Sequence, residues 1–240
     1  MSDQVYYKVL GADGLCCHGG AGRWSIDGSW MPAVYGGLAP CVRGYHLCLG
    51  EDLVEWLGPV IWTAEGRGKS FRSEQYHIFQ EARVLRTLEG WNSSVARAFS
   101  IACAERAVPV LEAVMPGDRR VMEALAVARA CIQDEKAWSD AQAVAAEVWN
   151  VSRLVDGAAR DAAIAVYGTV VWQNGGMAAW AAAGSARSAL AAAAWERSMA
   201  ESKEKGVHPR DAERGANGAS NAVMKAERIW QTEQLFALIR

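Results

Sequence analysis

The chain changes its composition abruptly near Trp91, and this change limits the folds that it can adopt. Residues 1–90 contain 14 of the 23 glycines but only 6 alanines, whereas residues 91–240 contain 38 alanines. Frequent glycines favour turns between short strands, and alanine has the highest helix propensity of all residues. We therefore predict a small α+β N-terminal domain over residues 1–90, followed by an all-α, Ala-rich helical bundle domain over residues 91–240.

Short runs of β-prone residues alternate with turn residues in the first part. Strands are predicted at residues 6–10, 22–26, 45–49, 59–65 and 78–88, with Ile78, Ala82 and Val84 pointing inward. Between two of these strands, residues 51–57 begin with two acidic residues and have apolar residues at helical spacing before Gly58. This pattern predicts a helix of two turns.

The second part contains helices with clear start and stop signals. Helices are predicted from Asn92 or Ser93 to 114, and over residues 118–131, 139–155, 158–173, 177–205 and 209–238. Asp118 is a predicted N-cap, Ser139 opens a segment with capping-box spacing, and Gly157 suits a left-handed position after a helix. Short connections between these helices predict an antiparallel bundle or an orthogonal helical array.

Alanine runs at 181–183 and 191–194 predict that helix axes approach closely there. Trp138 and Trp149 lie three helical turns apart and therefore on one face. We interpret the tryptophans of this part as core residues that fill gaps in an Ala-rich bundle. The alternative is that they form a stripe that binds a partner, since tryptophan is enriched at binding hot spots.

Cysteines and histidines of the first part are the candidate metal ligands. Cys16, Cys17 and His18 share one loop, and Cys41, His46 and Cys48 follow in another. Zinc sites use ligand pairs two to four residues apart, but six residues separate Cys41 from Cys48. We therefore expect no metal and no cofactor, and we expect the cysteines to be small buried apolar residues.

Catalytic motifs do not occur in the chain. The sequence lacks Gly-x-Ser-x-Gly, the phosphate-binding P-loop and the dinucleotide motif Gly-x-Gly-x-x-Gly. The glycine-rich residues 19–22 are not followed by Lys-Ser or Lys-Thr, so they predict a turn. We expect a protein that is not an enzyme.

The charge balance bears on possible partners. There are 25 Lys and Arg against 27 Asp and Glu, and neither part has a basic excess. A protein that binds DNA through its phosphates needs such an excess, so we expect no sequence-specific DNA binding by this chain alone. No apolar run is long enough to span a membrane, and the polar residues 1–4 do not resemble a signal peptide. Together with six cysteines that are expected to be reduced, this predicts a cytoplasmic protein.

The last predicted helix carries side chains of the types that anchor protein interfaces. These are Met224, Arg228, Trp230 and Phe236, which we predict to bind a protein partner. One face of this helix would then pack on the bundle while the other meets the partner. The alternative is that the whole segment closes the core.

Two stretches resemble known families. Residues 9–14, 17–20 and 41–48 resemble a small α+β domain of phage and actinobacterial proteins, which has no established catalytic residues. Residues 98–106, with Pro116 and residues 124–130, resemble an all-helical family of immunity proteins from toxin loci. Together the two stretches resemble accessory proteins of actinobacterial temperate phages.

Such accessory proteins include recombination directionality factors. The resemblance therefore implies a non-enzymatic protein that binds a large serine integrase in the host cytoplasm and promotes excision. The alternative that it implies is an immunity or counter-defence protein that neutralises a toxin or a host factor.

Overall fold

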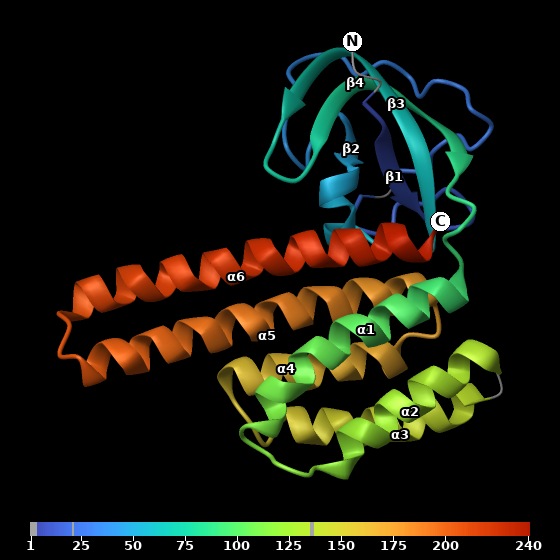
Figure 1. The fold of residues 1–240 in the computed structure, drawn as a ribbon. Coiled ribbons are helices and arrows are strands. Elements are labelled where there is room, and N and C mark those ends of the chain that lie inside the picture. The colour runs from blue at the N-terminus through green and yellow to red at the C-terminus, as the bar shows by residue number, and fades with distance from the viewer. Residues whose placement is uncertain (1–3, 21, 135–136) are drawn as a thin grey trace.

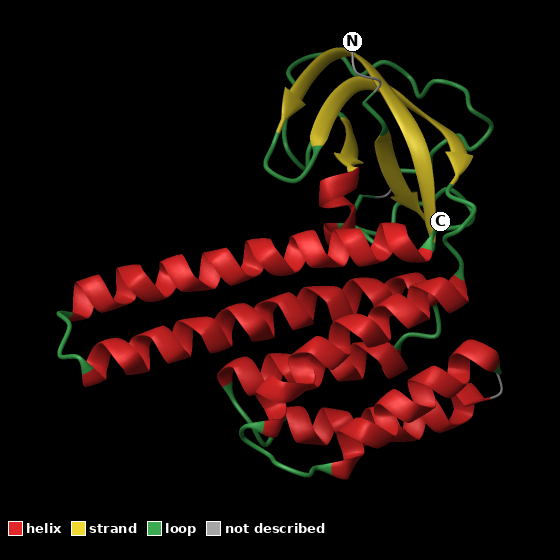
Figure 2. Cartoon of the chain, in the orientation of Figure 1, coloured by secondary structure: helices red, strands yellow, loops and turns green. Residues whose placement is uncertain are grey.

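The computed structural model describes residues 4–20, 22–134 and 137–240. Figure 2 shows that strands occupy the first part of the chain and that the α-helices follow them. The change falls between the last strand, which ends at Thr87, and the first α-helix, which begins at Ser93. The predicted fold class, an α+β part followed by an Ala-rich helical part, is confirmed.

Four antiparallel strands form a small closed barrel with the order β1-β2-β4-β3. They are β1 (Tyr6–Leu10), β2 (Tyr45–Leu49), β3 (Val60–Arg72) and β4 (His77–Thr87). Strand β1 pairs with β3 along its whole length, but with β2 only at Tyr6–Leu49 and Tyr7–Cys48. From Lys8 onward β1 has no pairing with β2, so the barrel wall is interrupted there.

Two predictions for the first part are wrong. Residues 22–26 form no strand, because Trp24 is buried in the barrel core and only an isolated bridge joins Leu15 to Arg23. Residues 51–57 form no α-helix but the shorter 3-10 helix η1 (Gly50–Glu55), after which the buried Leu57 turns into the core. The strand predicted at 59–65 extends to Arg72, and Ile78, Ala82 and Val84 are fully buried as predicted.

Six α-helices are described in the second part. They are α1 (Ser93–Glu112), α2 (Arg119–Gln133), α3 (Trp138–Ser152), α4 (Gly157–Val171), α5 (Gly175–Glu204) and α6 (Pro209–Leu238). The predicted caps Asn92 and Asp118 accept hydrogen bonds from the backbone N–H groups of Val95 and Arg120. The capping box at Ser139 is not formed, because α3 already begins one residue earlier. Gly157 has the predicted left-handed conformation (φ 55°), but it begins α4 instead of following α3.

Alanine-lined contacts hold α4 and α5 close together, as the alanine runs predict. Ala182 and Ala183 are fully buried, and a Cβ atom on Gly168 of α4 would lie 3.0 Å from the backbone nitrogen of Ala182. Such close backbones leave no room for an indole ring between them. The interpretation of the tryptophans as core residues is wrong for Trp180 of α5 and for Trp149 of α3, which are 38% and 42% exposed. Trp195 is also exposed, and its indole N–H donates to Asn217.

The barrel and the helices share one hydrophobic core. Val9, Leu53 and Ile61, on the side of the barrel that faces the helices, belong to the same buried cluster as Phe99 of α1 and Ala183 of α5. Figure 1 shows the barrel seated over the adjoining ends of α5 and α6, with the C-terminus at this junction. The two predicted domains are thus packed as one body.

A polar network crosses the junction within this core. Arg187 of α5 donates hydrogen bonds to Glu55 of η1 and to Gln231 of α6. Gln231 in turn donates to Glu227, and both carboxylate oxygens of Glu227 accept from the Arg106 Nε atom of α1 at 2.8–3.0 Å. Buried charges are stable only when they are paired and hydrogen-bonded, so the network fixes how the elements meet.

The antiparallel helices α5 and α6 extend well beyond the other four (Figure 1). We call the projecting residues 198–216 the arm; among them only Ala212 and Ala216 are buried. The arm is therefore held by contacts between its own two helices. Among the described helices, none is long and apolar enough to cross a membrane.

Candidate functional site

A cavity of about 650 Å³ opens where β1 and β2 part. Its walls come from the two strands, from two segments of the long loop between them, and from residues beside η1 and β4. The lining side chains are mostly apolar or aromatic and include no carboxylate and no arginine; they include Tyr7, Lys8, Val9, Cys16, Cys17, His18, Trp24, Cys41, Val42, Tyr45, His46, Leu47, Cys48, Trp56 and Tyr76. A cavity of this size and lining is typical of sites for small organic molecules.

Lys8 provides the cationic group of this cavity. Its side chain lies on the same side of β1 as Tyr6 and Leu10, because alternate residues of a strand share a face. The Lys8 Nζ atom donates a hydrogen bond to the backbone carbonyl of His46 at 3.3 Å and lies 4.9 Å from the centre of the Trp24 ring. Within the part of the chain that the structure describes, no carboxylate forms an ion pair with it.

Burial shifts the titration of several groups around the cavity towards their uncharged forms. It lowers the pKa of Lys8, an effect that the neighbouring Cys16, Cys48 and Cys17 oppose. It lowers the pKa of His46, to which the charge of Lys8 also contributes. Burial raises the pKa of the Cys17 thiol, and raises the pKa of the Cys48 thiol to about 12. Neither thiol is therefore a thiolate at neutral pH, and neither is activated as a nucleophile.

The structure brings the candidate metal ligands Cys16, Cys17, His18, Cys41, His46 and Cys48 to this cavity. The expectation that the cysteines are buried is wrong for Cys16 and Cys17, which are half-buried, and for Cys41, which is exposed. The His46 Nε2 atom accepts a hydrogen bond from the backbone N–H of Cys41 at 3.1 Å. The Cys48 thiol contacts the carbonyl oxygen of Tyr7 at 3.6 Å. Across residues 4–20, 22–134 and 137–240, no three His, Cys, Asp or Glu residues are grouped so that they could hold a metal ion.

His18 connects the cavity to the helices. Its Nε2 atom lies 2.8 Å from the carbonyl oxygens of both Trp56 and Leu57, and its ring centre is 5.1 Å from that of Trp180. The Trp180 indole N–H donates to the carbonyl of Glu55. A side chain of α5 thus supports the loop that forms one wall of the cavity.

The four residues predicted to bind a partner do not share one exposed face of α6. The Nη1 atom of Arg228 lies 3.6 Å from the Oδ1 atom of Asp52. The guanidinium carbon of Arg106 lies 4.1 Å from the centre of the Trp230 ring, and Phe236 packs against Tyr7. Met224 is the exposed member of the set. These contacts favour the alternative interpretation, in which this part of α6 closes the core.

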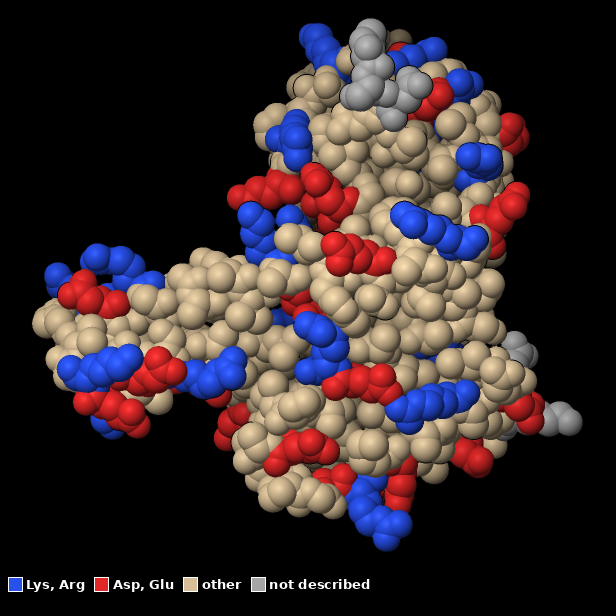
Figure 3. Space-filling model, in the orientation of Figure 1, with Lys and Arg blue, Asp and Glu red and all other residues tan. Residues whose placement is uncertain are grey.

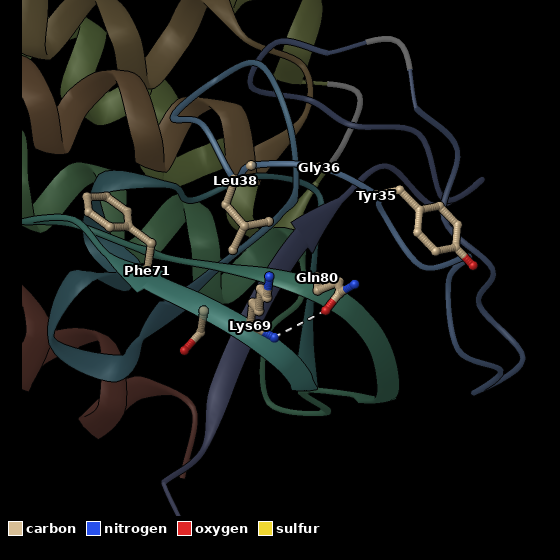
Figure 4. A pocket seen from close by; sticks show the side chains of 8 residues that line it. Tyr35, Gly36, Leu38, Lys69, Phe71 and Gln80 are labelled. Atoms are coloured by element: carbon tan, nitrogen blue, oxygen red, sulfur yellow. Dashed lines mark hydrogen bonds between the residues drawn. The ribbon is translucent and has the colours of Figure 1, made fainter.

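A second, shallower hollow of about 470 Å³ lies on the outside of β3 and β4. Figure 4 shows Phe71 and Tyr35 at its opposite ends, with Lys69 and Gln80 between them. The Gln80 side chain accepts a hydrogen bond from the backbone N–H of Lys69 at 3.3 Å. The hollow is open and holds no buried charged group, so it offers less to a ligand than the cavity at Lys8.

Sequence reasoning missed Lys8 as a site residue. The sequence does contain a signal for it. Lys8 is the one charged residue of an otherwise apolar strand, and it lies on the same inward face as Tyr6 and Leu10. Trp24, Trp56 and Tyr76 were missed because they come from three separate loops.

Comparison of the chain with protein-family models, with curated protein sequences and with solved structures finds no match.

Proposed function

We propose that the protein acts by binding another protein through the arm, and that this partner is a large serine integrase whose reaction it directs towards excision. The arm is the observation that carries the proposal. It places two helices in solvent, where they contribute little to the shared core and present an extended surface to a partner.

The charges of the arm favour a protein partner over DNA. Residues 198–216 contain four acidic residues, Glu201, Glu204, Asp211 and Glu213, and four basic residues, Lys203, Lys205, Arg210 and Arg214. Figure 3 shows red and blue side chains beside each other on the arm, and two ion pairs link them along the helices. A surface without a basic excess gains little from phosphate contacts.

The arm also carries two large apolar side chains, one near its base and one in the connection at its end. Val207, in the connection between α5 and α6, is 39% exposed, and Met199 is half-buried. Protein interfaces are enriched in Met relative to the rest of the protein surface. The integrase as partner rests on the resemblance to phage accessory proteins, and so does action in the cytoplasm, which the six free cysteines support.

The alternative, an immunity protein, rests on the resemblance around residues 103–106. In the fold, Cys103 and Ala104 are fully buried, while Glu105 and Arg106 form ion pairs with Arg129 and Glu227. These side chains serve packing between helices, so they offer a partner less than the arm does.

A variant that lacks the end of the arm tests the proposal. Residues 200–213 are replaced by a short glycine-rich turn, which rejoins the two helices at positions that already face each other, since Gly215 packs beside Ser198. The control exchanges the exposed pair Arg119 and Glu123 on α2. Circular dichroism verifies the fold of each variant.

Binding to a serine integrase and excision on hybrid attachment sites are then measured. We expect the parent and the control to bind the integrase and promote excision, and the shortened variant to lose both. Retention of both by the shortened variant would contradict the role of the arm. A parent that does not bind the integrase, or that shifts DNA alone at physiological salt, would refute the directionality-factor proposal.

A further inference from the structure

We propose that the cavity at Lys8 binds a small organic monoanion, a carboxylate or sulfonate with an apolar body. This inference is independent of the arm and of the integrase.

The position of the cation supports the charge of the ligand. Lys8 projects from β1 at the point where pairing with β2 ends, so its ammonium group reaches the cavity, where it hydrogen-bonds to the carbonyl oxygen of His46 on β2. Its contacts are a carbonyl oxygen and an aromatic face, which are both uncharged. An ammonium group in an apolar site attracts an anion strongly, because little water screens the interaction.

The rest of the lining supports a single charge and an apolar body. Among the described residues that line the cavity there is no second lysine and no arginine, so a phosphate dianion or a nucleic acid backbone would enter with its charge largely uncompensated. The aromatic rings of Trp24, Tyr45, Trp56 and Tyr76 provide flat apolar walls instead. The volume of about 650 Å³ is large enough for a molecule of one or two rings.

The contacts of Lys8 in the fold, with the His46 carbonyl and the Trp24 ring, provide no negative charge to balance its own. A methionine at position 8 would fill similar space without desolvating a charge, and the Lys8 ammonium has no ion-pair partner among the described residues. A charged group held at such a cost in an accessible cavity is typical of binding sites.

Two fluorescent probes that differ by one charge test the inference. The first is 8-anilinonaphthalene-1-sulfonate, an apolar monoanion, and the second is N-phenyl-1-naphthylamine, which lacks the sulfonate. We expect the full chain to bind the sulfonate, and Lys8→Met to weaken this binding about tenfold or more while it leaves the neutral probe unaffected. The control variant is Lys69→Met, an exposed lysine beside the shallow hollow, and it should leave both affinities unchanged.

Three results would overturn the inference. They are equal binding of the sulfonate by the parent and Lys8→Met, an equal loss of both probes, and no binding by the folded parent. A second measurement needs no variant. Alkylation of Cys17, which is half-buried and lines the cavity, is followed by mass spectrometry with and without the sulfonate probe. We expect the bound probe to slow the alkylation several-fold, and an unchanged rate would place the probe elsewhere and contradict the proposed site.

Discussion

The Nη2 atom of Arg187 lies 2.6 Å from the Oε2 atom of Glu55, and this ion pair joins the middle of α5 to the 3-10 helix of the barrel. Only 6% of the Arg187 side chain and 19% of the Glu55 side chain are exposed. Burial lowers the pKa of Arg187, and the negative charge of Glu55 opposes this shift. The pair thus holds the two parts of the chain together where water has little access.

Removal of one partner from this ion pair should be strongly destabilising. We expect Arg187→Met to lower the free energy of unfolding by about 3–5 kcal/mol, because it leaves Glu55 and Gln231 without their donor. The control is Arg129→Met, which breaks the exposed pair with Glu105 and should cost about 1 kcal/mol or less. Urea unfolding measures the change in the free energy of unfolding for both variants. If Arg187→Met costs no more than Arg129→Met, the ion pair between Arg187 and Glu55 is not important for stability.

Two glycines of α5 should respond in opposite ways to alanine. A Cβ atom on Gly176 would lie 2.0 Å from the carbonyl oxygen of Gly58, so Gly176→Ala must push the helix away from the barrel. Gly184 has nothing within 4 Å of the same position. We expect Gly176→Ala to lower the melting temperature clearly, and Gly184→Ala to stabilise the helix by about 0.5–1 kcal/mol. A neutral Gly176→Ala would show that the contact between α5 and Gly58 is loose enough to accept a methyl group.

Larger side chains should not fit in the alanine contact between α4 and α5. Ala182→Leu places extra carbons against Gly168 and should cost about 1–3 kcal/mol. Ala192 is only half-buried, so Ala192→Leu should cost less, and Ala222→Leu on the exposed side of α6 should stay within about 0.5 kcal/mol. Thermal melts of the three variants check this order, and an Ala182→Leu variant that melts with the parent would contradict the packing.

Lys8→Met should stabilise the protein at neutral pH and do so less at alkaline pH. Burial lowers the pKa of Lys8 in the folded protein below the ordinary value of 10.5, which applies to the unfolded chain. At a pH between these two pKa values, the unfolded chain therefore binds more protons than the folded one. The stability contributed by this group therefore rises with pH across that window. Tyr7 and Cys48 oppose this trend, because their pKa values are raised, but they are present in both proteins.

The comparison of Lys8→Met with its parent thus isolates the lysine. Urea unfolding at neutral pH and near pH 10.5 measures the difference in the free energy of unfolding. An advantage of the variant that does not shrink with rising pH would mean that Lys8 is as well solvated in the fold as in the unfolded chain.

Local signals in the sequence predict much of the fold. Tyr6–Leu10, Tyr45–Leu49 and Pro209–Leu238 begin and end as predicted, because turn glycines and a proline mark their limits. The predictions fail where tertiary contacts decide. Trp24 is in a β-prone run but leaves strand pairing to fill the barrel, and its burial depends on segments far along the chain.

The site is less predictable than the fold for the same reason. The cavity exists because pairing between β1 and β2 ends after Tyr7, and no local pattern encodes where two strands part. Four residues of α6 have the composition of an interface, but composition does not show that Arg228 finds Asp52 or that Phe236 packs on Tyr7. These contacts depend on how the last helix meets the first part of the chain.

The contact between Thr232 and the carbonyl of Glu51 spans 181 residues of the chain. During translation, the barrel strands therefore leave the ribosome long before the helix that packs on them has been made. Until then the core that Val9, Leu53 and Ile61 share with the helices is incomplete, because α1 and α5 have been made but α6 has not. We expect the nascent barrel to depend on chaperones over most of the synthesis of the chain, and to reach its stable form only when α6 is released.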